Sequence, residues 1–190
     1  VFVFDLNKRL IERSCRVTGS ITAICSSTSN EIWVAASLGG TNSVIHFFDN
    51  ITLYYISSMP LKDSFVRDMI AIPNQHQILS ACPLTCDIIL WNSITHQPIR
   101  RINIGQPANR LFLSNDRLWI GTHRDVLVYR CSSTDLDQWV VGESRVLSHH
   151  TSKINSIAKA DDRTVWISSQ DSVISRWNVE SLEFISEGKS

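Results

Sequence analysis

The 190-residue sequence predicts an all-β fold built from repeated units of four short antiparallel strands. Three observations support this: two recurring markers and the turn residues between them. In the first marker, an aromatic residue followed by a polar one closes a strand-like run, and the five pairs are Phe4-Asp5, Phe48-Asp49, Trp91-Asn92, Tyr129-Arg130 and Trp177-Asn178. They recur at intervals of about 38 to 48 residues, which is the length of a repeated structural unit.

A second marker precedes each later aromatic pair in the same order. It is a polar turn that leads into an apolar pair, at residues 30–33, 77–79, 117–119 and 164–166. The last unit shows the expected strands most clearly, at residues 154–158, 165–168, 173–177 and 182–185. Because the apolar stretches are short and are separated by turn residues such as Asp161-Asp162, strands are favoured over helices.

One segment, residues 64–70, also fits a helix. Its apolar residues Phe65, Val66, Met69 and Ile70 have helical spacing. Pro73 and the phase of the repeat favour a strand there instead.

Four short antiparallel strands in about 43 residues are typical of a β-propeller blade, and the period fits a WD40 unit better than a longer kelch unit. The last unit, SHHTSKINSIAKADDRTVWISSQDSVISRWN (residues 148–178), resembles a WD40 repeat residue by residue. His150, Ser169, Asp171 and Trp177 stand at the family's histidine, serine, turn aspartate and tryptophan positions, and Asn178 replaces the closing aspartate. The resemblance implies that these four residues form a buried structural hydrogen-bonded tetrad.

A catalytic triad is the alternative interpretation of serine, histidine and aspartate. The exposed nucleophile turn G-x-S-x-G is absent, so we expect no enzyme. The other units depart from the family pattern: Thr85 replaces the turn aspartate, and Tyr129 and Phe48 replace the tryptophan. The chain is therefore similar to the divergent regulatory propellers of larger signalling proteins, such as Rho exchange factors and leucine-rich-repeat kinases.

The repeat phase divides the chain into one strand pair and four blades. Residues 1–14 are expected to supply the outer strands of a preceding blade, and the four blades to span residues 15–58, 59–104, 105–146 and 147–190. Because both ends supply outer strands, we expect four and a half blades of a six- to eight-bladed ring, cut from a longer protein. A four-bladed ring with an overhanging strand pair is the alternative.

Composition narrows the function classes. The hydrophobic share of 43% predicts a folded domain, and the 18 basic residues balance the 18 acidic ones, so no global field would attract nucleic acid. No apolar run approaches the length of a membrane span. The five scattered cysteines favour reduced thiols and a cytoplasmic location.

Two further groups of residues could form ligand sites. Cys82 and Cys86, with His123 or the pair His149-His150, could begin a zinc site, but a second ligand pair at standard spacing is missing. Gly39-Gly40 could cradle a phosphate, but no helix start follows it. We therefore expect no metal and no cofactor.

Arg100-Arg101 is a possible contact for an anion or a lipid, because it is similar to the paired arginines of phosphoinositide-binding propellers, although the glycine that ends that motif is lacking. The stretch 98–130 around it is basic, which is also typical of a solvated edge. The function expected first is a non-catalytic scaffold that binds a protein or peptide through blade-top loops and the channel mouth. The alternative is a propeller that binds phosphoinositides or acidic membranes through Arg100 and Arg101.

Overall fold

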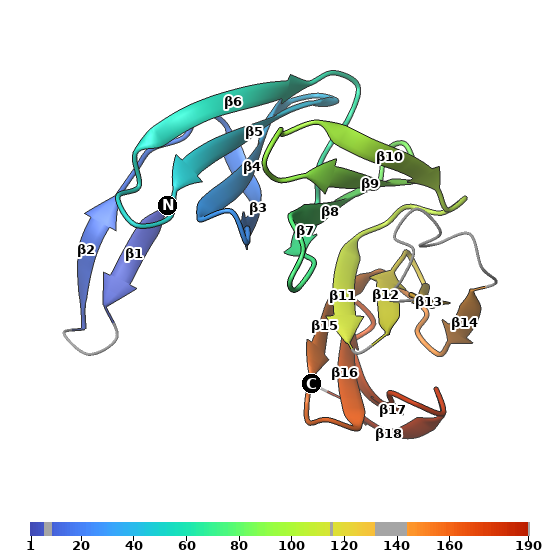
Figure 1. Ribbon diagram of the computed structural model, residues 1–190. Helices are drawn as coiled ribbons and strands as arrows, with labels where there is room; N and C mark the ends of the chain where they lie inside the picture. The colour runs from blue at the N-terminus through green and yellow to red at the C-terminus, as the bar shows by residue number, and fades with distance from the viewer. Residues whose placement is uncertain (6–8, 115, 132–143, 190) are drawn as a thin grey trace.

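The computed structural model describes residues 1–5, 9–114, 116–131 and 144–189, and every regular element among them is a β-strand (Figure 1). A hairpin of β1 (Phe2–Asp5) and β2 (Leu10–Ser14) comes first. Four sheets follow, which we number blades 1 to 4 in chain order. The all-β fold of four-stranded antiparallel units is therefore confirmed.

Each blade is a meander of four consecutive strands. Blade 1 contains β3 (Ser20–Ser26), β4 (Glu31–Gly39), β5 (Asn42–Asp49) and β6 (Tyr55–Leu61). Blade 2 contains β7 (Asp68–Ala71), β8 (Gln77–Cys82), β9 (Asp87–Asn92) and β10 (Pro98–Asn103).

Blades 3 and 4 repeat the same order. Blade 3 contains β11 (Arg110–Ser114), β12 (Arg117–Gly121), β13 (Asp125–Arg130) and β14 (Arg145–Ser148). Blade 4 contains β15 (Ile154–Lys159), β16 (Thr164–Ser169), β17 (Val173–Asn178) and β18 (Phe184–Lys189).

The blades follow one another along an arc, as in a propeller (Figure 1). The first strands β3, β7, β11 and β15 contact one another in sequence on the inside of the arc, and the fourth strands lie on the outside. Since strand direction alternates in a meander, the connections from second to third strand and from blade to blade share one end. We call that end the upper rim and the opposite end the lower rim.

Three hydrophobic clusters hold the arc together, one at each junction between neighbouring blades. Between blades 1 and 2, Trp33 meets Trp91 edge-on, with ring centroids 6.5 Å apart. Middle strands such as β8 are buried on both faces, which explains why their sequences are continuously apolar rather than alternating. The repeat in the sequence thus follows from a repeated inter-blade core.

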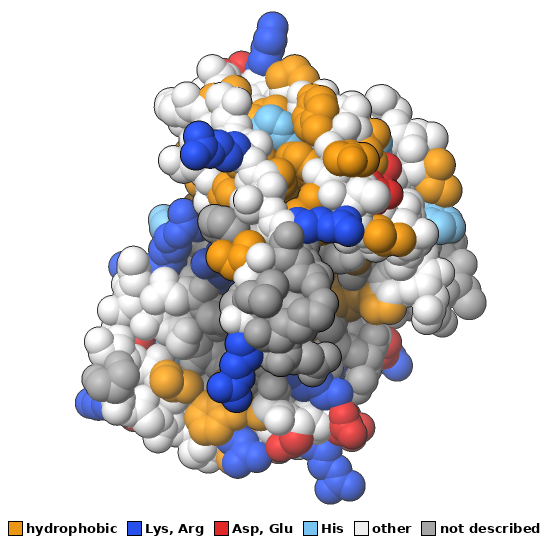
Figure 2. All heavy atoms as spheres, turned by 90° about the vertical axis from the view of Figure 1, so that its left-hand side faces the viewer, with side chains coloured by type: hydrophobic (Ala, Val, Ile, Leu, Met, Phe, Trp, Pro, Cys, Tyr) orange, Lys and Arg blue, Asp and Glu red, His pale blue; other side chains and the backbone are white. Residues whose placement is uncertain are grey.

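The two ends of the arc each leave apolar side chains exposed. On blade 1, Ala23 and Cys25 point into the junction with blade 2, whereas Ile24 between them points the other way and is exposed. Figure 2 views the molecule from the left-hand side of Figure 1. It shows hydrophobic side chains gathered over the upper part of this face, which blade 1 forms. On blade 4, the marker residue Trp166 is likewise exposed, with the Arg176 guanidinium over its ring.

Some expected boundaries differ from the strands. The limit between residues 58 and 59 falls inside β6, and the limit between 146 and 147 falls inside β14. The last expected strand, 182–185, lies at 184–189 instead, because Leu182 has a positive φ of 58° in the preceding turn. Asn178 holds that turn by accepting hydrogen bonds from the backbone N–H groups of Glu180 and Ser181.

In the segment that also fitted a helix, strand β7 includes residues 68–70, so the strand interpretation holds for that part. No helix in the described part of the chain is long and apolar enough to cross a membrane.

Candidate functional site

A chain of buried side chains crosses blade 4 beneath the upper rim. Asp171, in the turn between β16 and β17, places Oδ2 3.1 Å from His150 Nδ1, and His150 Nε2 lies 2.8 Å from Ser175 Oγ. Trp177 Nε1 donates to the same Ser175 oxygen at 2.8 Å. All donors and acceptors are matched when His150 carries its proton on Nδ1 and accepts from the serine hydroxyl. This chain, which we call the relay, ties two upper-rim connections to strand β17.

Ser169 is not the serine of this relay, which corrects the sequence prediction. His150, Asp171 and Trp177 do belong to it, but Ser169 donates to the backbone oxygen of Ser152 at 2.9 Å. Ser175 stands two residues before Trp177, so both side chains point to the same face of β17. That spacing was the signal in the sequence that could have identified it.

Alanine at position 175 is therefore expected to destabilise the protein more than alanine at position 169. Ser175→Ala leaves Trp177 Nε1 and His150 Nε2 without a partner in a fully buried place, at a cost of about 1–3 kcal/mol. Ser169→Ala removes one bond to a backbone oxygen and a long one, 3.4 Å, from the backbone N–H of Asp171, and is expected to cost about 0.5–1.5 kcal/mol. Urea denaturation of both variants checks the order, and a larger loss at Ser169 would contradict the assignment.

The carboxylate of Asp171 is held in its ionised form. Burial raises its pKa, but hydrogen bonds from the backbone N–H groups of Thr151 and Val173 and from His150 outweigh burial and place the pKa below its ordinary value. The turn between β16 and β17 is thereby bound to the connection that enters blade 4. Two loops of the upper rim are thus positioned by one side chain.

Blade 2 keeps only part of such a relay. In blade 2, Trp91 Nε1 donates to Ser80 Oγ at 2.9 Å, and both residues are buried. Thr85, at the aspartate position, donates only to the backbone oxygen of Cys82 within the turn. The departure in the sequence therefore corresponds to a shortened relay in the structure.

At the lower rim, a contact between blades 1 and 2 was not foreseen. Trp33 Nε1 donates to Glu31 Oε2 at 3.2 Å, and the same oxygen lies 2.8 Å from His96 Nε2 of blade 2. The His96 ring stacks on Phe47 at 3.8 Å between centroids. His96 follows the aromatic marker of its unit by five residues, and nothing in the sequence links it to Glu31.

Of the two cysteines considered for zinc, Cys82 ends β8 and Cys86 lies in the ordinary turn that follows. Cys82 is buried and burial raises the pKa of its thiol, while Cys86 Sγ donates to the backbone oxygen of Pro83. His149 Nε2 lies 2.7 Å from Glu187 Oε2 in blade 4, whereas the two cysteines belong to blade 2. Among the described residues no group of three His, Cys, Asp or Glu side chains could hold a metal ion. The glycine pair 39–40 forms the turn between β4 and β5 with positive φ.

Arg100 and Arg101 line a groove of about 380 Å³ on the outside of the arc, between the outer strands of blades 1 and 2. Its apolar lining consists of Met59, Leu61, Trp91, Pro98 and Ile99. Arg101 Nη1 lies 3.1 Å from Oδ2 of the buried Asp87, so Arg101 already has a structural partner. In the part of the chain that the structure describes, Arg100 forms no ion pair.

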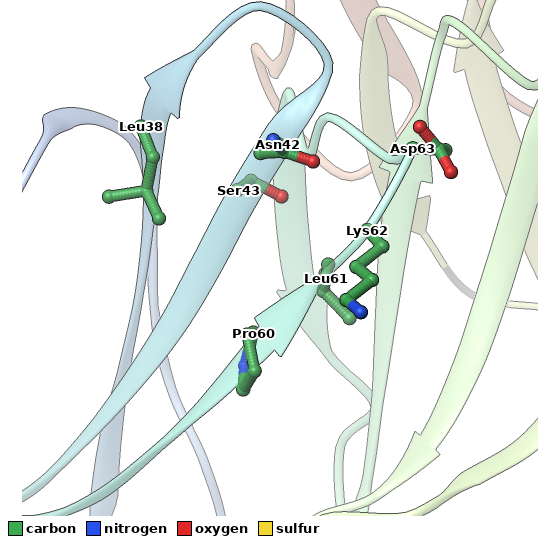
Figure 3. A pocket seen from close by; sticks show the side chains of 7 residues that line it. All are labelled: Leu38, Asn42, Ser43, Pro60, Leu61, Lys62 and Asp63. Carbon is green, nitrogen blue, oxygen red and sulfur yellow. The ribbon is translucent and has the colours of Figure 1, made fainter.

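A pocket of about 330 Å³ opens at the upper rim of blade 1 (Figure 3). Leu38 of β4 lies on one side, Asn42 and Ser43 of β5 lie in the middle, and the end of β6 with its following connection lies on the other side. That connection supplies Lys62 and Asp63. The pocket thus combines an apolar wall with charged and amide groups, a composition suited to a peptide side chain.

Three basic residues stand where the inner strands begin: Arg67, Arg110 and Lys153. We call them the inner basic cluster. They open β7, β11 and β15 of three successive blades at the upper rim. The signal in the sequence was a basic residue at, or directly before, the first strand of three consecutive units. The basic stretch 98–130 includes Arg110, but the cluster as such was not predicted.

No protein-family model matches the chain, and no curated protein resembles it closely enough in sequence to be identified as a relative.

Proposed function

We propose that the chain is a divergent WD40-like propeller module that catalyses no reaction and binds another protein or a peptide through its upper rim. The observation that carries this proposal is the rim itself. Connections from four blades meet there on a rigid frame, and the relay fixes two of them in blade 4. Loops held by such a scaffold are the usual place for specific binding.

The relay supports a binding role rather than hydrolysis. It has the order Asp171, His150, Ser175, which is also the order of a catalytic triad. Ser175 is 0% exposed and is engaged by both His150 and Trp177. A hydroxyl in that position cannot meet a substrate, so we assign the relay to stability.

The free thiols of all five cysteines favour a reducing compartment, and we propose the cytoplasm as the location. We also propose that the module is a regulatory domain of a larger signalling protein.

Selection of peptides from a random display library on the whole chain tests the proposal. We expect the selected peptides to bind about tenfold more weakly to the upper-rim variant Asn42→Ala/Lys62→Ala, because both side chains line the rim pocket. The matched lower-rim variant Gln75→Ala/Thr95→Ala is expected to bind normally. The proposal would be overturned if the selected peptides bound normally to the upper-rim variant and more weakly to the lower-rim variant.

A phosphoinositide reader is the second candidate, favoured by the groove beside Arg100 and Arg101. Arg100→Ala is the cleaner variant, because Arg101→Ala would also leave the buried Asp87 without its ion pair. Liposome flotation on vesicles that contain phosphoinositides is expected to show binding that Arg100→Ala reduces. Equal flotation of wild type and variant, or none for either, would refute this candidate.

A further inference from the structure

We propose that the inner basic cluster of Arg67, Arg110 and Lys153 binds an acidic segment of the partner protein, whose carboxylates or phosphates lie across the beginnings of β7, β11 and β15. The inference rests on the proposed function and deepens it, because it names the chemistry of the partner and the side of the rim that it occupies.

The three residues are brought together by contacts between the inner strands. Arg110 Nε donates to the backbone oxygen of Asn155 in β15, and Arg110 Nη1 lies 3.5 Å from the backbone oxygen of Arg67. The Arg110 side chain therefore spans from blade 2 to blade 4. The positive charges of Arg67 and Arg110, after burial as the larger cause, lower the pKa of Lys153, which indicates that the three charges act on one another.

One acidic residue, Asp68, lies beside the cluster, but its carboxylate is engaged elsewhere. Asp68 Oδ2 accepts the backbone N–H of Leu111 at 2.9 Å, and burial raises the pKa of Asp68 despite Arg110 and Arg67 nearby. No described aspartate or glutamate forms an ion pair with any of the three cluster residues.

Several other cations of the chain have acidic partners. These pairs include Arg101–Asp87, Arg130–Asp116, Lys159–Asp162 and Arg176–Asp161. The inner basic cluster is thus an accumulation of like charge whose repulsion an anionic ligand would relieve.

The placement favours an extended peptide over a membrane surface or nucleic acid. The cluster lies on the inside of the arc, at the start of inner strands that contact one another (Figure 1). Neighbouring sheets pack about 10 Å apart, and an extended chain advances about 3.3 Å per residue. Because the inner strands approach one another more closely than that, an acidic residue at every second or third position would meet one basic residue of each blade.

Fluorescence anisotropy with a labelled 12-residue peptide that carries glutamate at every third position tests this match, with the glutamine version and a phosphoserine version as further arms. We expect the glutamate and phosphoserine peptides to bind and the glutamine peptide to bind at least about tenfold more weakly. Binding should weaken as the salt concentration rises from about 50 to 300 mM, because the three side chains are only partly buried and dissolved ions can screen them.

Two lysines at opposite ends of one strand provide matched variants. Lys153→Gln at the start of β15 is expected to raise the dissociation constant of the glutamate peptide about fivefold. Lys159→Gln at the end of the same strand should change that constant less than about twofold. Arg67→Gln is a second variant of the cluster with the same expected direction. Thermal melting of each variant confirms that the fold is intact.

The outcomes separate this inference from the proposed function. If peptides selected on the upper rim are not acidic, or if Lys159→Gln costs as much as Lys153→Gln, the inference fails while rim binding stands. If no peptide depends on the upper rim at all, the proposed function fails with it. Binding to anionic vesicles that depends on Lys153, without binding to any acidic peptide, would overturn the inference in favour of a lipid.

Discussion

Replacing Asp171 with alanine is expected to lower the free energy of unfolding by about 1–3 kcal/mol. The substitution removes the acceptor for three donors at once: the backbone N–H groups of Thr151 and Val173, and Nδ1 of His150. The His150 side chain is 1% exposed, so its N–H cannot turn to water. Urea denaturation followed by circular dichroism measures the loss.

Asp162→Ala is the matched control for this prediction. Asp162 is also a turn aspartate of blade 4, but its side chain is 95% exposed and pairs only with Lys159. Its removal is expected to change the free energy of unfolding by less than about 0.5 kcal/mol. Equal losses for Asp162→Ala and Asp171→Ala would show that the relay adds no stability.

The effect of Asp171 should also depend on pH. Its pKa in the folded protein lies below the ordinary value of 3.8, so the ionised carboxylate is favoured by folding. This stabilisation is complete above the ordinary pKa and is lost as the pH falls through the lowered one. The stability difference between wild type and Asp171→Ala should therefore be constant near neutral pH and shrink below about pH 4. A difference that grew on acidification would contradict the lowered pKa.

Gly121→Ala is expected to lower the free energy of unfolding by about 1–3 kcal/mol through overpacking. A Cβ atom at Gly121 would lie 2.6 Å from Cγ2 of Ile154 and 3.3 Å from Cβ of Arg110. Ile154 cannot retreat easily, because it is 0% exposed and its backbone N–H donates to the oxygen of Thr122. The glycine therefore permits the close approach of blades 3 and 4.

Gly188→Ala provides the control for crowding. Gly188 lies in the outer strand β18, where an added Cβ would meet no atom within 4 Å. The expected stability is unchanged or slightly raised, since alanine loses less backbone entropy than glycine in a strand. Thermal unfolding of the two variants tests the contrast, and a tolerated Gly121→Ala would mean that blades 3 and 4 can separate without cost.

The sequence predicted the repeated architecture well because each blade is coded locally. Short apolar runs, turn residues and the aromatic markers all lie within one unit, and an antiparallel meander pairs neighbours in the chain. Strand ends were predicted less well, as the turn around Leu182 illustrates. There a positive φ and the Asn178 side chain delay β18 by two residues.

The site was predicted only in part: one relay serine was assigned wrongly, and one contact joins different blades. His150, Asp171 and Trp177 were identified from the resemblance of one unit to a WD40 repeat, whereas Ser175 was overlooked in favour of Ser169. No local spacing could reveal that Glu31 meets His96 across a blade junction. Contacts between units depend on packing, which periodicity does not encode.

By itself, the sequence determined the all-β class and the four-stranded unit, since these depend on strand period and turn chemistry within about 43 residues. The resemblance of its last unit to a WD40 repeat added three of the four relay residues. Tertiary structure alone decided which serine completes the relay and that Gly121 must lack a side chain. It also decided that Arg67, Arg110 and Lys153, each some 43 residues from the next, begin adjoining inner strands. The physical reason is that neighbouring blades bring equivalent positions together, so a charge repeated once per unit becomes a cluster only when the sheets pack.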